Sequence, residues 1–173
     1  MEISTRWKTR SKATSSGGNA PPVSVADRPT SVSLPHEITT AMRAHARAEA
    51  PREACGIIIG SAPAASGGAP LRWIPTTNVL ASSTLYEIDA AELLRISLDA
   101  DDAGEFIWGI VHSHVASPAV PSTTDTTVAG YPDALYILVS LAPSQVAPDG
   151  EPGIRAWWIV DRSATEVRLR LQR

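Results

Sequence analysis

The chain contains almost no cysteine and no long apolar run, and both absences limit what it can be. Cys55 is the single cysteine among 173 residues, so no disulfide can form within the chain, which fits a reducing compartment. No apolar run approaches the roughly 18 residues that a transmembrane helix needs. The N-terminal segment is basic but has no apolar core or cleavage signature of a secretion signal. We therefore predict a cytoplasmic protein that does not enter a membrane.

Charge is modest overall but unevenly placed. The net charge is −3, yet residues 1–32 hold five basic and two acidic residues. Of the 15 basic and 18 acidic residues in the chain, this leaves 10 and 16 in the remainder. Because an acidic domain is a poor partner for phosphate backbones, we expect no nucleic-acid binding.

The same N-terminal segment lacks the side chains that build a core. It is rich in Ser, Thr, Gly and Pro, with almost no large apolar residue after Trp7. Such a segment cannot bury enough surface to offset the entropy lost on ordering. We predict a disordered tail over residues 1–32 and a single folded domain over residues 33–173, supported by a hydrophobic content of 43%.

The downstream region alternates between helical and extended patterns. Apolar runs bounded by turn residues predict strands, and apolar residues at helical spacing after a capping residue predict helices. The predicted strands cover residues 55–60, 71–75, 106–112, 135–141, 154–160 and 167–171, and the predicted helices cover residues 35–49, 89–104 and 122–130. The run at 135–141 is apolar nearly throughout, so we place it centrally in the sheet. This pattern predicts an α+β domain with a mostly antiparallel or mixed sheet flanked by helices.

Two histidines follow the buried strand predicted at 106–112. Side chains alternate along a strand, so His112 and His114 point to the same face and can reach one ion. Asp125 offers an oxygen ligand, and three protein ligands with an open fourth position are typical of catalytic zinc. Two plainer interpretations remain at this point. The histidines can be strand-end residues bonded to nearby carbonyls, and Ser122-x-x-Asp125 can be a helix capping box.

The spacing of these residues resembles that of a known family. His112-x-His114, seven residues, then Ser122-x-x-Asp125, with Glu53 upstream, is similar to the JAMM (MPN-plus) metallopeptidases. The resemblance extends through residues 86–89, 121–125 and 135–140 and covers roughly residues 34–173. It is strongest to a small bacterial branch whose actinobacterial members release cysteine from a ubiquitin-like sulfur-carrier protein. Val115 is a departure, since many members have proline there, and it bears on the path of the loop.

The resemblance implies a role for each residue of the site. His112, His114 and Asp125 would hold zinc, Glu53 would act as general base, and the Ser122 hydroxyl would stabilise the oxyanion. From the residues alone, Glu53 has another interpretation, as a surface carboxylate paired with a neighbouring arginine. The candidates for that pairing are Arg47 and Arg52.

The resemblance also implies the partner: a ubiquitin-like sulfur-carrier protein, or a similar protein with a Gly-Gly tail. Its extended C-terminus would add to a sheet edge as a strand, and the loop at 61–70 either flanks that groove or only connects two strands. A deconjugase acting on another peptide or isopeptide bond, and a silent binding module, are the alternative functions. We expect Cys55 to be a packed strand residue without catalytic function, and His36 and His45 to face solvent without a role.

Overall fold

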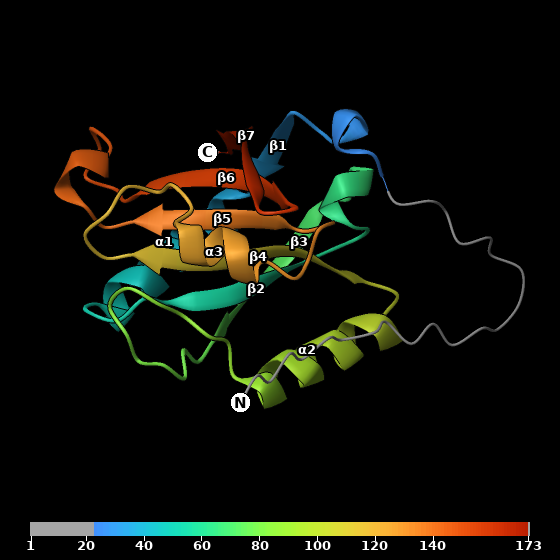
Figure 1. The fold of residues 1–173 in the computed structure, drawn as a ribbon, viewed down its shortest axis with the longest axis horizontal. Coiled ribbons are helices and arrows are strands. Elements are labelled where there is room, and N and C mark those ends of the chain that lie inside the picture. Colours follow the sequence, from blue (N-terminus) through green and yellow to red (C-terminus); the bar gives the residue numbers. More distant parts are fainter. Residues whose placement is uncertain (1–22, 173) are drawn as a thin grey trace, which may run out of the picture.

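A seven-stranded mixed sheet forms the centre of the computed structural model, which describes residues 23–172 (Figure 1). The strand order is β1-β7-β6-β5-β4-β2-β3, with β1/β7 and β4/β5 parallel and the other neighbours antiparallel. The strands are β1 (Ser31–Leu34), β2 (Cys55–Gly60), β3 (Pro70–Thr76), β4 (Phe106–His114), β5 (Leu135–Ser140), β6 (Gly153–Val160) and β7 (Ser163–Leu171). The helices are α1 (His36–Glu49), α2 (Ala90–Asp102) and α3 (Thr123–Val128), with 3-10 turns at Val25–Asp27, Ala64–Ser66 and Pro143–Gln145. The predicted α+β class is confirmed.

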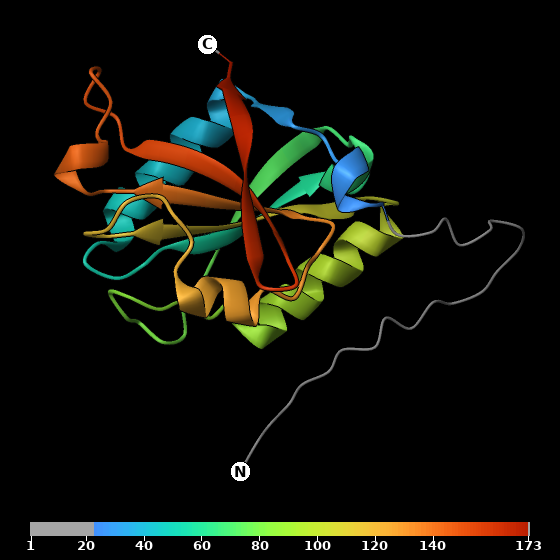
Figure 2. The ribbon, with the colours of Figure 1, turned by 45° about the horizontal axis from the view of Figure 1, so that its top comes forward.

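Alternation along the strands divides the core between the two faces of the sheet. Ile58 packs on one face with Met42 of α1, while its neighbour Ile57 packs on the other face with Ile96 of α2. Figures 1 and 2 show α1 on one side of the sheet and α2 and α3 on the other. α1 and α2 therefore each bury one apolar face and leave the other face to solvent, as the helical spacing predicts, whereas Asp125 is the only buried residue of α3.

The strand predicted to be central is central. β5 has three strands on each side and all six of its residues are buried. Because β4 and β5 are parallel, their carboxyl ends meet at the same end of the sheet, where His114 pairs with Ser140. This end of the sheet carries the side chains discussed below.

The domain begins earlier than the predicted boundary after residue 32. Arg28 is buried and lies 3.3 Å from the Asp133 carboxylate, and its guanidinium stacks over the ring of Trp158. The Trp158 indole N–H donates to the Pro29 carbonyl, and β1 pairs with β7. Residues 23–32 thus join the domain through hydrogen bonds and one buried cation, which a search for large apolar residues does not detect. The rest of the predicted tail, residues 1–22, lies outside the described residues.

The loop at 61–70 lies at the far end of β2 from Glu53 and does not flank the site. Its backbone is held by a bond from the Ala65 N–H to the Asp133 carbonyl and by the Trp108 indole, which donates to the Gly68 carbonyl. The loop is therefore a connection between β2 and β3 that lies away from Glu53. Over residues 23–172, no helix is both long enough and apolar enough to cross a bilayer.

Candidate active site

His112 and His114 end the buried strand β4 and face the same side of the sheet. Both are buried, and their Nε2 atoms lie 3.2 Å apart. Ser113, between them, points to the opposite face, where its hydroxyl oxygen accepts the Ala54 backbone N–H at 2.8 Å. The alternation predicted from sequence is thus confirmed, and it directs two imidazoles to one point.

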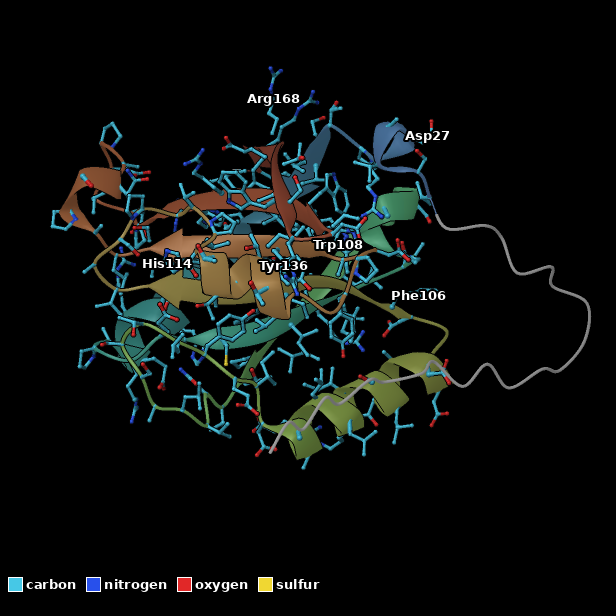
Figure 3. The ribbon with its side chains drawn as sticks, viewed as in Figure 1. Asp27, Phe106, Trp108, His114, Tyr136 and Arg168 are labelled. Atoms are coloured by element: carbon cyan, nitrogen blue, oxygen red, sulfur yellow. The ribbon has the colours of Figure 1, made fainter. Side chains whose placement is uncertain are left out.

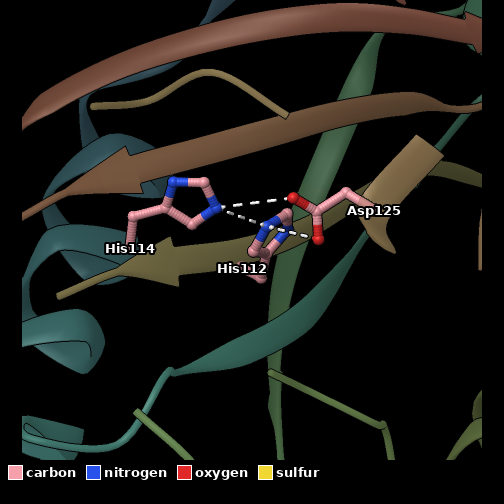
Figure 4. Close-up of side chains that lie close together, drawn as sticks. All are labelled: His112, His114 and Asp125. Carbon is pink, nitrogen blue, oxygen red and sulfur yellow. Dashed lines mark hydrogen bonds and ion pairs between the residues drawn. The ribbon is translucent and has the colours of Figure 1, made fainter. Parts of the chain in front are cut away.

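Asp125 reaches the same point from α3. Ser122 is the N-cap of this short helix: its hydroxyl accepts the Asp125 N–H at 3.1 Å, and the Ser122 N–H donates to Asp125 Oδ2 at 2.6 Å. The predicted capping box therefore exists. It also orients the carboxylate, whose oxygens lie 3.4 Å from His112 Nε2 and 3.5 Å from His114 Nε2 (Figure 4).

The donor set fits a divalent metal such as zinc. One ligand atom from each of His112, His114 and Asp125 lies within 4.8 Å of the others, and two imidazole nitrogens with one carboxylate oxygen make the three-ligand set of catalytic zinc sites. His114 Nδ1 lies 2.7 Å from the Pro118 carbonyl, which leaves Nε2 free to face the centre. The alternative interpretation, in which the two histidines simply bond to nearby carbonyls, explains the position of His114 Nδ1 but not the approach of the two Nε2 atoms to each other and to Asp125.

The environment favours the metal-ligand protonation state at His112 and Asp125. Burial lowers the pKa of His112, so its imidazole is neutral. Burial would raise the pKa of Asp125, but hydrogen bonds from His112 and His114 outweigh it and hold that pKa well below its ordinary value. A neutral imidazole and an ionised carboxylate are the forms that coordinate a metal. At His114 burial lowers the pKa, but hydrogen bonds with Asp125 and the Pro118 carbonyl outweigh it and raise the pKa overall, so a metal would have to displace a proton there.

Glu53 lies beside this cluster. Cys55 pairs with His112, and the Ser113 N–H donates to the Ala54 carbonyl at 2.9 Å, so continuing the register places Glu53 opposite His114. Glu53 is buried, with 4% of the residue exposed. Burial raises its pKa from 4.5 to about 7, with the charge of Asp125 adding to the rise and His114 opposing it.

The structure does not support the alternative role for Glu53, in which it forms a surface ion pair with a neighbouring arginine. Arg52 pairs with Glu49 at 3.0 Å and Arg47 pairs with Glu151 at 3.0 Å. Both arginines that could have paired with Glu53 therefore bind other carboxylates.

The segment between β3 and α2 forms another part of the site, and sequence reasoning did not assign it a role. The Tyr86 ring stacks on the His112 imidazole, with centroids 4.3 Å apart and planes 17° from parallel. Asn78, in the same segment, donates to the Glu53 carbonyl. In the sequence, residues 86–89 contribute only to the resemblance to the family, because no local pattern shows which strand end a loop residue will contact.

The remaining cysteine and histidine predictions have mixed outcomes. Cys55 is buried in β2 and its pKa is raised to about 11, mainly by burial, so it is a packed thiol as predicted. His36 is exposed, as predicted. The prediction for His45 is wrong: it is half-buried, its Nε2 atom is shielded without a partner among the described residues, and its ring lies 6.0 Å from that of Trp73.

This fold and this ligand set define a domain of the JAB/MPN type, and comparison with known families agrees. Residues 35–160 match the family described as prokaryotic homologs of the JAB domain. The chain is a member of this family, in agreement with the resemblance to JAMM proteins.

Individual relatives give the same result. The chain is 41% identical over 130 residues to a protein of Mycobacterium tuberculosis named CysO-cysteine peptidase, covering 75% of this chain and 84% of that protein. It is 32% identical over 131 residues to a protein of Haloferax volcanii named desampylase, covering 73% and 87%.

Solved structures show the same architecture. A protein of Desulfitobacterium hafniense superimposes with a TM-score of 0.67 at 30% identity, covering 81% of this chain and 92% of that one. A JAB1/MPN domain protein of Archaeoglobus fulgidus, at 17% identity, gives a TM-score of 0.51 and covers 82% and 100%, which supports the fold alone.

Proposed function

We propose that this protein is a zinc-dependent peptidase that hydrolyses the amide bond at the C-terminus of a ubiquitin-like sulfur-carrier protein and releases cysteine. The observation that carries the proposal is the convergence of His112, His114 and Asp125 with Glu53 buried beside them. The family membership and the relative named CysO-cysteine peptidase support the choice of reaction and substrate.

Each residue of the site has a chemical role in this proposal. His112, His114 and Asp125 would hold zinc, a Lewis acid that lowers the pKa of water toward about 7. Glu53 accepts the proton of the attacking water and passes it to the departing amine. A pKa raised to about 7 suits a carboxylate that must both take up and release a proton near neutral pH.

Ser122 is the proposed oxyanion stabiliser. Its hydroxyl oxygen accepts a bond from the Asp125 N–H, and accepting that bond leaves its own O–H free to donate. Ser122 is exposed, so bound substrate would have to cover it. Donation to the developing negative charge on the substrate carbonyl would then lower the barrier. Capping the helix and stabilising the oxyanion are therefore compatible roles.

The substrate would enter as an extended C-terminal tail that pairs with backbone groups. Among residues 23–172, the edge strands of the sheet are β1 and β3, and β3 is the one near the site, since only β2 separates it from β4. Backbone pairing on β3 would hold the tail while its final amide lies against Glu53.

A second candidate is a family peptidase that cleaves another peptide or isopeptide bond. The two relatives carry different names, so family membership alone does not choose the bond. A silent binding module is less favoured, because the complete ligand set and a buried Glu53 would then have no use.

The test compares three substrates by intact mass with the purified, zinc-loaded protein: a carrier–cysteine adduct, the same carrier joined to a lysine side chain, and an unrelated peptide. The proposal predicts loss of one cysteine residue from the adduct and no loss when a chelator has removed the metal. Cleavage of the lysine conjugate alone would favour the second candidate. No cleavage of any substrate by fully zinc-loaded protein would contradict both.

A further inference from the structure

The segment between β3 and α2, residues 77–89, lies against the candidate active site and is organised around a single side chain. It has no helix or strand of its own apart from an isolated bridge between Asn78 and Ile88. Its internal backbone bonds run from the Val79 N–H to the Glu87 carbonyl, from the Asp89 N–H to the Thr77 carbonyl and from the Ala81 N–H to the Asn78 carbonyl, and none of them is made by residues 82–86. The middle of the segment therefore needs another source of order.

The Asn78 side chain supplies it through four hydrogen bonds. Its amide nitrogen donates to the Glu53 carbonyl at 2.9 Å and to the Leu85 carbonyl at 3.1 Å. Its amide oxygen accepts the N–H groups of Leu80 and Glu87, both at 3.1 Å. Two donors and two acceptor lone pairs are all that this side chain has. Its hydrogen-bonding capacity is fully used.

These bonds connect the two sides of the site. One fixes the backbone of Glu53, and two others fix Leu85 and Glu87, the residues on either side of Tyr86. Tyr86 stacks on His112, so the same amide orders the segments that carry the proposed base and the ring covering one proposed metal ligand. A further bond, from the Glu53 N–H to the Ser82 carbonyl at 2.8 Å, closes the connection.

We propose that Asn78 is a positioning residue, which holds the Glu53 carboxylate and the Tyr86 ring in place against the His112–His114–Asp125 cluster. This inference rests on the proposed function for its effect on catalysis, but not for its effect on structure. Only a primary amide of this length has two donors and an acceptor in this arrangement. Aspartate has no donor, and it would present a carboxylate to the Glu53 and Leu85 carbonyls.

The test measures the exchange of single backbone amides by NMR and steady-state turnover in two variants, Asn78→Ala and Asn78→Asp. Alanine removes all four bonds, and aspartate removes the two that Asn78 donates. We expect the Glu53 amide to exchange at least roughly tenfold faster in both, because its environment opens locally. Amides in β5, such as that of Ile137, should keep their wild-type rates. Zinc content should be unchanged.

Turnover should fall while substrate binding stays. A displaced base costs roughly 10- to 100-fold in kcat, and we expect KM to remain within about threefold. Ser82→Ala is the matched control: it removes the bond from the Thr84 N–H to the Ser82 hydroxyl in the same segment and leaves the four Asn78 bonds intact. Its exchange at Glu53 and its kcat should remain close to wild type. If Asn78→Ala does not fold, Asn78→Asp carries the test.

Wild-type exchange at Glu53 in the folded Asn78 variants would overturn the proposal, as would equal effects in the Ser82 control. A normal kcat in both variants, with an active wild type, would also overturn it and leave the proposed function standing. If the wild-type protein cleaves no substrate but the Asn78 variants show local opening at Glu53, the proposed function fails and the positioning role remains.

Discussion

The two ends of β2 and β4 differ in what they bury. At one end lie four buried groups that can carry charge: Glu53, His112, His114 and Asp125. At the other end lies Trp108 (Figure 3). It packs so closely on the backbone that a Cβ on Gly60 would sit 2.6 Å from the Trp108 ring and 2.8 Å from the Ala69 carbonyl. Burying unpaired polar groups costs stability, whereas burying a large aromatic side chain adds to it.

The difference separates the energetics of the fold from the chemistry of the site. The polar end is held in place by hydrogen bonds to neighbouring loops, which position groups that would otherwise favour water. The buried apolar side chains at the other end contribute stability that offsets the cost of burying the polar groups. Substitutions at the polar end should therefore change metal binding and activity more than stability, and substitutions at the apolar end should do the reverse.

The largest expected effect is loss of metal and activity in His114→Ala. Removing one of three ligands should take away most of the zinc and essentially all turnover, while the fold persists, because a catalytic site contributes less to folding than a closed structural one. Elemental analysis of the purified variant measures the zinc. His36→Ala, which alters an exposed histidine on α1, is the control and should keep full zinc. Full zinc occupancy in His114→Ala would rule out the proposed ligand set.

Trp108→Ala tests the opposite end. Truncating a buried Trp should cost about 3–5 kcal/mol in the free energy of unfolding, and thus on the order of 10 °C in Tm. Below its transition, the variant should still bind one zinc per chain. Trp108→Phe keeps most of the ring and loses only the indole bond to the Gly68 carbonyl, so its loss should be smaller. A Trp108→Ala variant that unfolds like wild type would contradict the packing role of this end.

Ser122→Ala should lower kcat roughly 10²-fold, because it removes the proposed donor to the oxyanion. It also removes an N-cap, which typically costs about 1 kcal/mol of stability. Ser122→Thr keeps a hydroxyl and serves as the control, since threonine also caps helices. Steady-state kinetics together with thermal melting separate the two roles. A Ser122→Ala enzyme with normal kcat would leave Ser122 with the capping role alone.

Glu53 should make the metal-free protein less stable as the pH rises. Its pKa is about 7 in the folded protein and 4.5 ordinarily, so the folded state binds an extra proton between those values. Stability from this group is present below pH 4.5 and is lost as the pH rises through 7. Glu53→Gln stays neutral, so at pH 8 it should be more stable than wild type by at least about 1 kcal/mol, with the gap narrowing toward pH 5. Urea melts at the two pH values measure this, and a gap independent of pH would exclude the raised pKa.

The parts predictable from the sequence are those set by local rules. The alternation at His112 and His114 and the cap at Ser122 depend on neighbours within a few residues, and the long apolar run at 135–141 indicated a central strand. Glu53 could be assigned only through the resemblance to a family, since its approach to His114 depends on the pairing of β2 with β4.

The parts that could not be predicted depend on contacts between distant segments. Arg28 joins the domain by bonding to residues more than 100 positions away. In the sequence, nothing distinguishes Asn78 from an ordinary turn residue. Only the structure shows that its side chain bonds to the Glu53 backbone. His45 becomes half-buried because α1 packs beside β3, where Trp73 lies. No periodicity or capping rule contains this information.

The most direct test of the central claim compares wild type with Glu53→Gln, both loaded with zinc, on the carrier–cysteine adduct. Glutamine keeps the size of the side chain but cannot take up a proton, and losing a general base costs about 10²–10⁴-fold in rate. We predict one zinc per chain in both proteins, release of cysteine by wild type, and at most about one hundredth of that rate in the variant. Zinc-loaded Glu53→Gln that turns over at the wild-type rate would contradict the claim that this end of the sheet is a metallopeptidase centre with Glu53 as its base.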